Sequence, residues 1–251
     1  MKNKNKLLRL MVMSVLIALG VVISPLLRFE GMCPMAHLIN IVCSVLLGPL
    51  ESLICAILIG IIRMMFMGIP PIALTGAIFG AFLSGVLYRA SKGRILFAVV
   101  GEIIGTGVIG AIASYPVMTF LWGKEGLSWL FYIPSFICGT LIGGSIAFIF
   151  LKKLNGSGLL IRFQSTLGSP VYRDKGGIVS NSLTIMSLGV ICFIVIKTLT
   201  GLFGMTDEIW NYISFALLGG FITAGIIYFA VKKLKGEKNA GIKDKQNESG
   251  A

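Results

Sequence analysis

Long apolar runs alternate with short polar segments along most of this 251-residue chain. Several of the runs reach the ~18 residues that predict a membrane-spanning helix. The pattern predicts eight helices, at about 7–27, 35–47, 50–67, 71–88, 95–115, 129–151, 183–203 and 210–231. The expected fold is therefore an all-α polytopic membrane protein, with a six-helix bundle followed by two additional C-terminal transmembrane helices.

A polar stretch after the sixth predicted helix suggests how the chain is divided. We expect residues 1–155 to form one six-helix domain, 156–182 a cytoplasmic basic linker, and 183–231 two extra transmembrane helices. Residues 232–251 are charged and contain Gly and Asn, which predicts a disordered cytoplasmic tail. The N-terminal run is longer than the core of a signal peptide and no cleavage site follows it, which predicts a retained first helix.

The composition and the distribution of charge agree with a membrane location. Hydrophobic residues make up 56% of the chain and charged residues 13%, whereas a soluble domain carries about 25% charged residues. Eighteen of the 22 Lys and Arg residues fall in segments on one predicted side of the membrane, and the positive-inside rule places that side, with both termini, in the cytoplasm. The basic residues thus act as topology signals, and no zinc-finger spacing or basic–aromatic pattern predicts nucleic-acid binding.

Motifs for catalysis and for ATP binding are absent from the sequence. There is no G-x-x-x-x-G-K-[ST] phosphate loop, no H-E-x-x-H and no nucleophile triad. The five cysteines are scattered without a C-x-x-C pair, so neither a disulfide nor a metal site is predicted. The sequence favours a binding protein that is not an enzyme, carries no cofactor and depends on partners for energy.

The second predicted helix is short and carries a pair of polar residues. A helix over 35–47 spans roughly 20 Å, against about 30 Å of hydrocarbon, so its outer end begins below the membrane surface and predicts a cavity open to the outside. His37 and Asn40 are three residues apart and share a helix face. Their ability to donate and accept hydrogen bonds suits a small heterocycle, although an interhelical hydrogen bond without a ligand is the alternative.

Three further residues are candidates for the same site. Arg63, near the outer end of its helix, either lines the cavity or extends its charge toward water. Glu102 is a carboxyl inside an apolar helix, a position that requires a partner or water; it either braces the helices, through Thr106 or a basic residue, or lines the pocket floor. Tyr115 stands before Pro116, where we expect the fifth helix to end, and suits stacking on a ring or the aromatic belt at the membrane surface.

A literal G-x-G-x-x-G occupies residues 105–110. A dinucleotide site would need a preceding strand, whereas this motif lies inside an apolar helix. With Gly101 it forms a G-x-x-x-G pair, which predicts close packing between helices.

Several segments of the first 154 residues together resemble the ThiW family, the substrate-binding S components of energy-coupling-factor (ECF) transporters for the thiazole precursor of thiamin. The resemblance is carried by P-M-A-H-L-I-N-I-V-C-S-V-L-L-G-P at 34–49, Arg63, G-E-I-I-G-T-G-V-I-G-A-I-A-S-Y-P at 101–116 and W-G-K-E at 122–125. It implies a six-helix S-component-like domain in the cell membrane of a bacterium that captures hydroxyethylthiazole from outside. The two helices after residue 155 have no counterpart in that pattern.

The resemblance also implies partners. An S component of this family docks on a transmembrane coupling subunit that carries two ABC ATPases, and the small residues Ser14 and Ala18 on the first helix would then form the docking face. Two alternatives remain open: an S component for another small vitamin or heterocycle, and a membrane scaffold protein without a transport role.

Overall fold

The computed structural model describes residues 2–25, 33–172, 177–202 and 208–248. Within these ranges the chain is almost entirely helical and forms no strand, which confirms the predicted all-α class. The chain divides into two compact units, Met1–Asp174 and Lys175–Ala251, which we describe separately. The expected domain boundaries at 155, 182 and 231 stay predictions.

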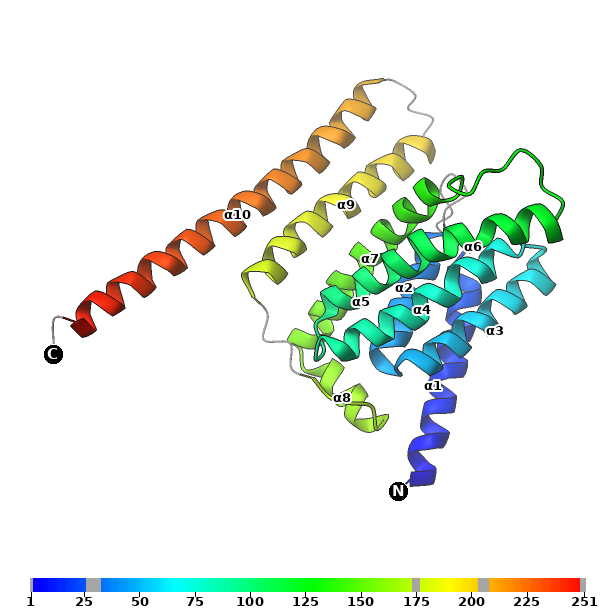
Figure 1. Cartoon of the computed structure of the whole chain (residues 1–251), viewed down its shortest axis with the longest axis horizontal. Helices are drawn as coiled ribbons and strands as arrows, with labels where there is room; N and C mark the ends of the chain where they lie inside the picture. The colour runs from blue at the N-terminus through cyan, green and yellow to red at the C-terminus, as the bar shows by residue number, and fades with distance from the viewer. Residues whose placement is uncertain (1, 26–32, 173–176, 203–207, 249–251) are drawn as a thin grey trace. The chain divides into compact units, whose positions relative to one another are not determined.

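The first unit is a bundle built from one N-terminal helix, a helical hairpin and three longer elements (Figure 1). Its elements are α1 (Lys2–Ile23), α2 (Pro34–Leu46), α3 (Pro49–Met67), α4 (Ile72–Ala90), α5 (Ile95–Glu102), η1 (Ile103–Gly110), α6 (Ala111–Pro116), η2 (Val117–Leu121), α7 (Ile133–Gly156) and α8 (Leu159–Thr166). Segments α5 to η2 follow one another as a single rod, in which η1 and η2 have the wider π-type turns.

In the described part of the whole chain, six helices are long and apolar enough to cross a membrane: α1, α3, α4, the rod, α7 and Glu208–Leu234. Helix α2 and Ile178–Phe193 are apolar but shorter. A multi-pass membrane protein is therefore confirmed.

Helices α2 and α3 form a helical hairpin. Gly48 joins them with φ +113°, a conformation that residues with a side chain rarely adopt. A Cβ at this position would also collide with the Arg89 guanidinium. Pro49 then begins α3, where its missing N–H removes no helical hydrogen bond. The short α2, 13 residues long, is thus held against longer neighbours.

Glycines bring the rod into direct contact with α4. A Cβ on Gly105 would lie 2.5 Å from the Phe79 carbonyl oxygen and 2.6 Å from the Gly80 Cα. Gly101 meets the backbone at Ser84 in the same way. Because the contacts are to backbone atoms, only glycine permits this separation. The structure confirms that the G-x-G-x-x-G motif serves helix packing.

The end predicted for the fifth helix at Pro116 is wrong. Pro116 has helical angles, φ −63° and ψ −35°, and the rod continues to Leu121. A proline removes one helical hydrogen bond, but a helix continues past it when packing holds both sides. Ser114 and Met118, on either side of the proline, are both buried.

Residues after α7 pack against the rest of the first unit and cap the end of α2. Helix α8 buries Leu160 and Gln164, and the following turn buries Ser169. Side chains from this segment and from two other elements donate to the last carbonyls of α2 and its turn: Gln164 to Val45 (3.0 Å), Ser169 to Leu46 (2.8 Å), and Arg9 and Arg89 to Leu47 (2.6 and 3.3 Å). The segment predicted as a linker thus supplies partners for backbone groups that a helix end leaves free.

The second unit consists of α9 (Ile178–Leu202) and α10 (Glu208–Glu248), which run antiparallel. Ser182 donates to the Gly225 carbonyl (2.6 Å), and Gly189 lies against Phe221. Helix α10 continues into the tail that the sequence predicts to be disordered, where Lys and Glu, both good helix formers, are frequent.

Candidate functional site

A cavity of about 560 Å³ lies near the N-terminal end of α2. Its wall comes from α2, α3, the first half of α4, η1, η2 and the start of α7 with the residues before it. The size falls in the ~300–1,000 Å³ range of small-molecule sites. Most of the wall is apolar, and its polar side chains are His37, Arg63, Thr106, Lys124, Tyr132 and Ser135.

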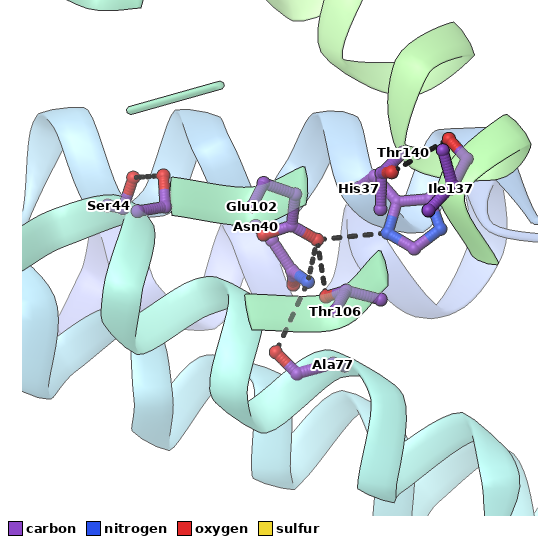
Figure 2. Close-up of polar contacts among 9 residues, drawn as sticks. His37, Asn40, Ser44, Ala77, Glu102, Thr106, Ile137 and Thr140 are labelled. Carbon is purple, nitrogen blue, oxygen red and sulfur yellow. Dashed lines mark hydrogen bonds and ion pairs between the residues drawn. The ribbon is translucent and has the colours of Figure 1, made fainter. Parts of the chain in front are cut away.

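A buried carboxyl group organises the polar residues behind this wall (Figure 2). Glu102 is fully buried, and three side chains converge on its Oε1. Thr106 Oγ1 and Asn40 Nδ2 donate to this atom from 3.0 Å each, and His37 Nδ1 lies 2.9 Å away. Asn40 also approaches the Ala77 carbonyl at 3.4 Å. The second oxygen, Oε2, has no hydrogen-bond partner among the described residues.

The spacing of these polar residues along their helices explains how they come together. His37 and Asn40 are three residues apart on α2, and Glu102 and Thr106 are four apart along the rod, so each pair shares one face. Gly80 of α4 leaves the room that the carboxyl occupies, because a Cβ there would lie 2.7 Å from Glu102 Oε2. The arrangement therefore depends on three helices meeting at one level.

His37 connects the buried cluster to the cavity. Its side chain is 12% exposed and lines the wall, while Nδ1 faces Glu102. No residue in the described ranges bonds its Nε2, which leaves that nitrogen for a ligand. Glu102 fixes the orientation of the ring, as carboxylates commonly do for functional histidines.

Of the predicted site residues, His37 and Arg63 line the cavity. Asn40 and Glu102 are not part of the wall and lie behind it, holding His37. Tyr115 is also absent from the wall and packs on Trp129, with ring centroids 4.5 Å apart. The role predicted for each of them in binding stays a proposal.

The two predicted docking residues lie on the exposed face of α1. Ser14 and Ala18 are both exposed. The Ser14 hydroxyl donates to the Leu10 carbonyl at 3.0 Å within the helix, so its polar group needs no partner from another protein.

Several wall residues could not be selected from the sequence. They are mainly aromatic or apolar and come from the end of the rod and the residues before and within α7: Met118, Lys124, Phe131, Tyr132 and Phe136. Only Thr106 carried a clear signal, its four-residue spacing from Glu102. Burial raises the pKa of the Tyr132 hydroxyl, a group that is protonated at neutral pH in any case and can donate a hydrogen bond.

Comparison with known proteins assigns the family. Searches of curated proteins and of solved structures found no match. The family described as thiamine-precursor transporter protein (ThiW) matches residues 10–157, which include every residue of the cavity wall. It is a family of transporters and not of enzymes. A match over more than half of the chain shows that this protein belongs to the ThiW family of thiamine-precursor transporters.

Proposed function

We propose that this protein is the substrate-binding S component of an ECF-type importer and captures hydroxyethylthiazole, a precursor of thiamin, from outside the cell. The observation that carries the proposal is a cavity of ligand size, inside the family match, whose wall presents His37 held by a buried carboxyl. Such a site has the mostly apolar wall and few oriented polar groups that small-molecule binding requires.

The composition of the cavity wall suits a small sulfur-containing heterocycle. Met118, Tyr132 and Phe136 offer apolar and aromatic surface to a flat ring, and sulfur packs favourably against aromatic edges. His37 Nε2 accepts a hydrogen bond from the hydroxyl or donates one to the ring nitrogen, depending on its protonation. Asn40 and Glu102 contribute by fixing His37.

The proposed topology gives the cavity access from outside. The cavity lies at the N-terminal end of α2, and the distribution of basic residues supports an orientation in which this end faces away from the cytoplasm. Both termini are then cytoplasmic, and the protein lies in the bacterial cell membrane.

Energy for uptake would come from partner subunits. The sequence contains no phosphate loop, so we assign ATP hydrolysis to two ABC ATPases that act through a transmembrane coupling subunit. Helix α1 offers small exposed residues, Ser14 and Ala18, at which another helix can approach closely.

Binding of hydroxyethylthiazole to the purified protein, measured by isothermal titration calorimetry, tests the proposal. We expect His37→Ala to weaken binding about tenfold or more, since the hydrogen bond to the ligand is lost, and Asn40→Ala to weaken it less. Ser44→Ala is the matched control, because Ser44 lies on the same helix but bonds Ser84 (2.7 Å) away from the wall.

Three outcomes would contradict parts of the proposal. Unchanged affinity in both His37→Ala and Asn40→Ala would refute the assigned site. Binding of a different heterocycle in place of hydroxyethylthiazole would refute the ligand. If the protein binds no ligand and no coupling subunit copurifies with it, the importer role is wrong and a scaffold is favoured.

A further inference from the structure

We propose that the cavity contains an anion subsite at Arg63 and therefore binds a thiazole precursor carrying a phosphate monoester or a carboxylate more tightly than the neutral alcohol. The inference rests on the proposed function, because it concerns the same cavity and the same heterocycle. It differs in assigning a charge to the ligand.

The first observation is a buried arginine without a counter-ion. Arg63 is 4% exposed and lines the cavity. Its Nη2 lies 3.6 Å from Cys33 Sγ, a weak acceptor, and its Nε is buried without a partner. No carboxylate of the described residues forms an ion pair with it. A guanidinium does not lose its proton in a protein, so burial leaves a permanent charge that requires compensation.

The second observation is the sign of the surrounding charge. Arg63 and Lys124 are both part of the wall, whereas the described wall includes no Asp or Glu. Glu102 lies outside the wall, and its Oε1 is already bonded by His37, Asn40 and Thr106. The charge that this cavity lacks is therefore negative.

The hydrogen-bond donors of the cavity wall are of the types that bind an oxyanion. The planar guanidinium presents parallel N–H groups that fit a phosphate or carboxylate in a bidentate manner. Tyr132 adds a hydroxyl that is buried and has no partner in the part of the chain that the structure describes. Lys124 adds a cation from the exposed segment before α7.

Arg63 and His37 line the same cavity. The contact residue of Arg63, Cys33, is the N-cap of α2 and precedes His37 by four residues, which corresponds to about 6 Å at the helical rise. A ligand can then place its anion at Arg63, its ring along the aromatic wall and a ring atom near His37. One molecule thereby uses both polar parts of the cavity.

The test compares three probes by calorimetry: hydroxyethylthiazole, its phosphate monoester, and a thiazole carboxylate. In the unmodified protein we expect at least one of the two anions to bind about tenfold or more tightly than the alcohol, as charge-assisted hydrogen bonds allow. The comparison between phosphate and carboxylate identifies which anion the subsite takes.

Substitutions of Arg63 test whether this residue causes the preference for the anion. Arg63→Met keeps much of the apolar stem of the side chain without its charge, and we expect it to lower the affinity for the preferred anion about tenfold more than it lowers the affinity for the alcohol. Arg63→Lys keeps the charge but not the planar fork and should be intermediate. Arg94→Met makes the same chemical change at an exposed arginine that is not part of the wall. Each variant is first checked for monodisperse elution and for its Tm.

The outcomes separate the two proposals. If the alcohol binds and neither anion binds more tightly, the anion subsite is wrong while the proposed function stands. If no thiazole compound binds, but another heterocyclic acid binds and loses affinity in Arg63→Met, the proposed ligand is wrong and the subsite stands.

One competing counter-ion comes from the chain itself. Glu30 is the acidic residue of segment 26–32, which lies outside the described residues. If Glu30→Gln lowers the Tm in the unmodified protein but not in Arg63→Met, and neither anion is preferred, Arg63 is paired internally and the inference is overturned.

Discussion

Replacing Glu102 removes the acceptor shared by three donors in the centre of the first unit. In Glu102→Ala, the Thr106 hydroxyl donates instead to a carbonyl of its own helix. The His37 ring is partly exposed to the cavity, so it bonds water or changes tautomer. Asn40 is 4% exposed and has only the long contact to Ala77 left. One unsatisfied buried amide costs about 1–3 kcal/mol, and two weakened bonds add about 1 kcal/mol. We therefore expect a loss of about 3 kcal/mol.

Glu102→Gln removes the negative charge but keeps an oxygen that accepts hydrogen bonds. The amide keeps an oxygen where Oε1 lies and fills the same volume, so the loss is limited to the difference between charged and neutral hydrogen bonds, about 1 kcal/mol. In a chain of this size ~1 kcal/mol shifts the Tm by about 2–4 °C. The expected decreases are then about 6–12 °C for Ala and about 2–4 °C for Gln.

Thermal unfolding in detergent, followed by the size-exclusion peak that remains after heating, measures these shifts. Irreversible unfolding makes the rank order more informative than absolute energies. A Tm for Glu102→Ala equal to or above that of the unmodified protein would refute the reasoning. It would show that the cost of burying the carboxyl exceeds the value of its three bonds.

Two further predictions concern a packing contact between helices and a cap at a helix end. Gly105→Ala should destabilise the protein by about 1–3 kcal/mol, because its Cβ meets the backbone of α4; the matched change Gly219→Ala, with no atom nearby, should be neutral or stabilising by up to ~1 kcal/mol. Equal Tm values for the two variants would contradict the contact. Gln164→Leu should lower the Tm by about 2–6 °C, since the Val45 carbonyl and the Tyr88 hydroxyl each lose this bond; an unchanged Tm would show that the cap adds no stability.

Periodicity and run length were sufficient to predict most helices of the first unit. The short second helix is observed at Pro34–Leu46, against a predicted 35–47, because proline and Gly48 mark its ends in the sequence. Where such signals are missing, the observed helix boundary differs from the predicted one by several residues: α7 begins at Ile133, four residues after the predicted start. Apolar residues continue through that junction, so hydrophobicity alone does not define it.

The candidate site was predictable only within single helices. The shared face of His37 and Asn40 follows from their spacing, whereas their meeting with Glu102 depends on how far the rod is shifted along α2. Gly101 and Gly105 hold the rod against the backbone of α4; the G-x-x-x-G pair predicts such close packing, but neither the partner helix nor the level at which the two helices meet. The position of Tyr115 before Pro116 suits a ligand or the aromatic belt equally, and its contact with Trp129 joins two segments whose meeting the spacing in the sequence does not predict.

The buried Gln164 was missed for a different reason. It lies in a polar stretch, where composition predicts exposure, yet it is fully buried. Leu160 and Leu167, four residues before it and three after, are buried on the same side, and this helical spacing was the signal that could have identified a packed face.

The cap on α2 has a practical consequence for dividing the protein. The family match ends at residue 157, whereas Gln164 and Ser169, which bond the Val45 and Leu46 carbonyls, come later in the chain. A shortened protein ending at the family boundary would expose those carbonyls and the apolar surface beneath Leu160. One ending after Asp174 would keep the whole first unit, and would show whether ligand capture requires α9 and α10 at all.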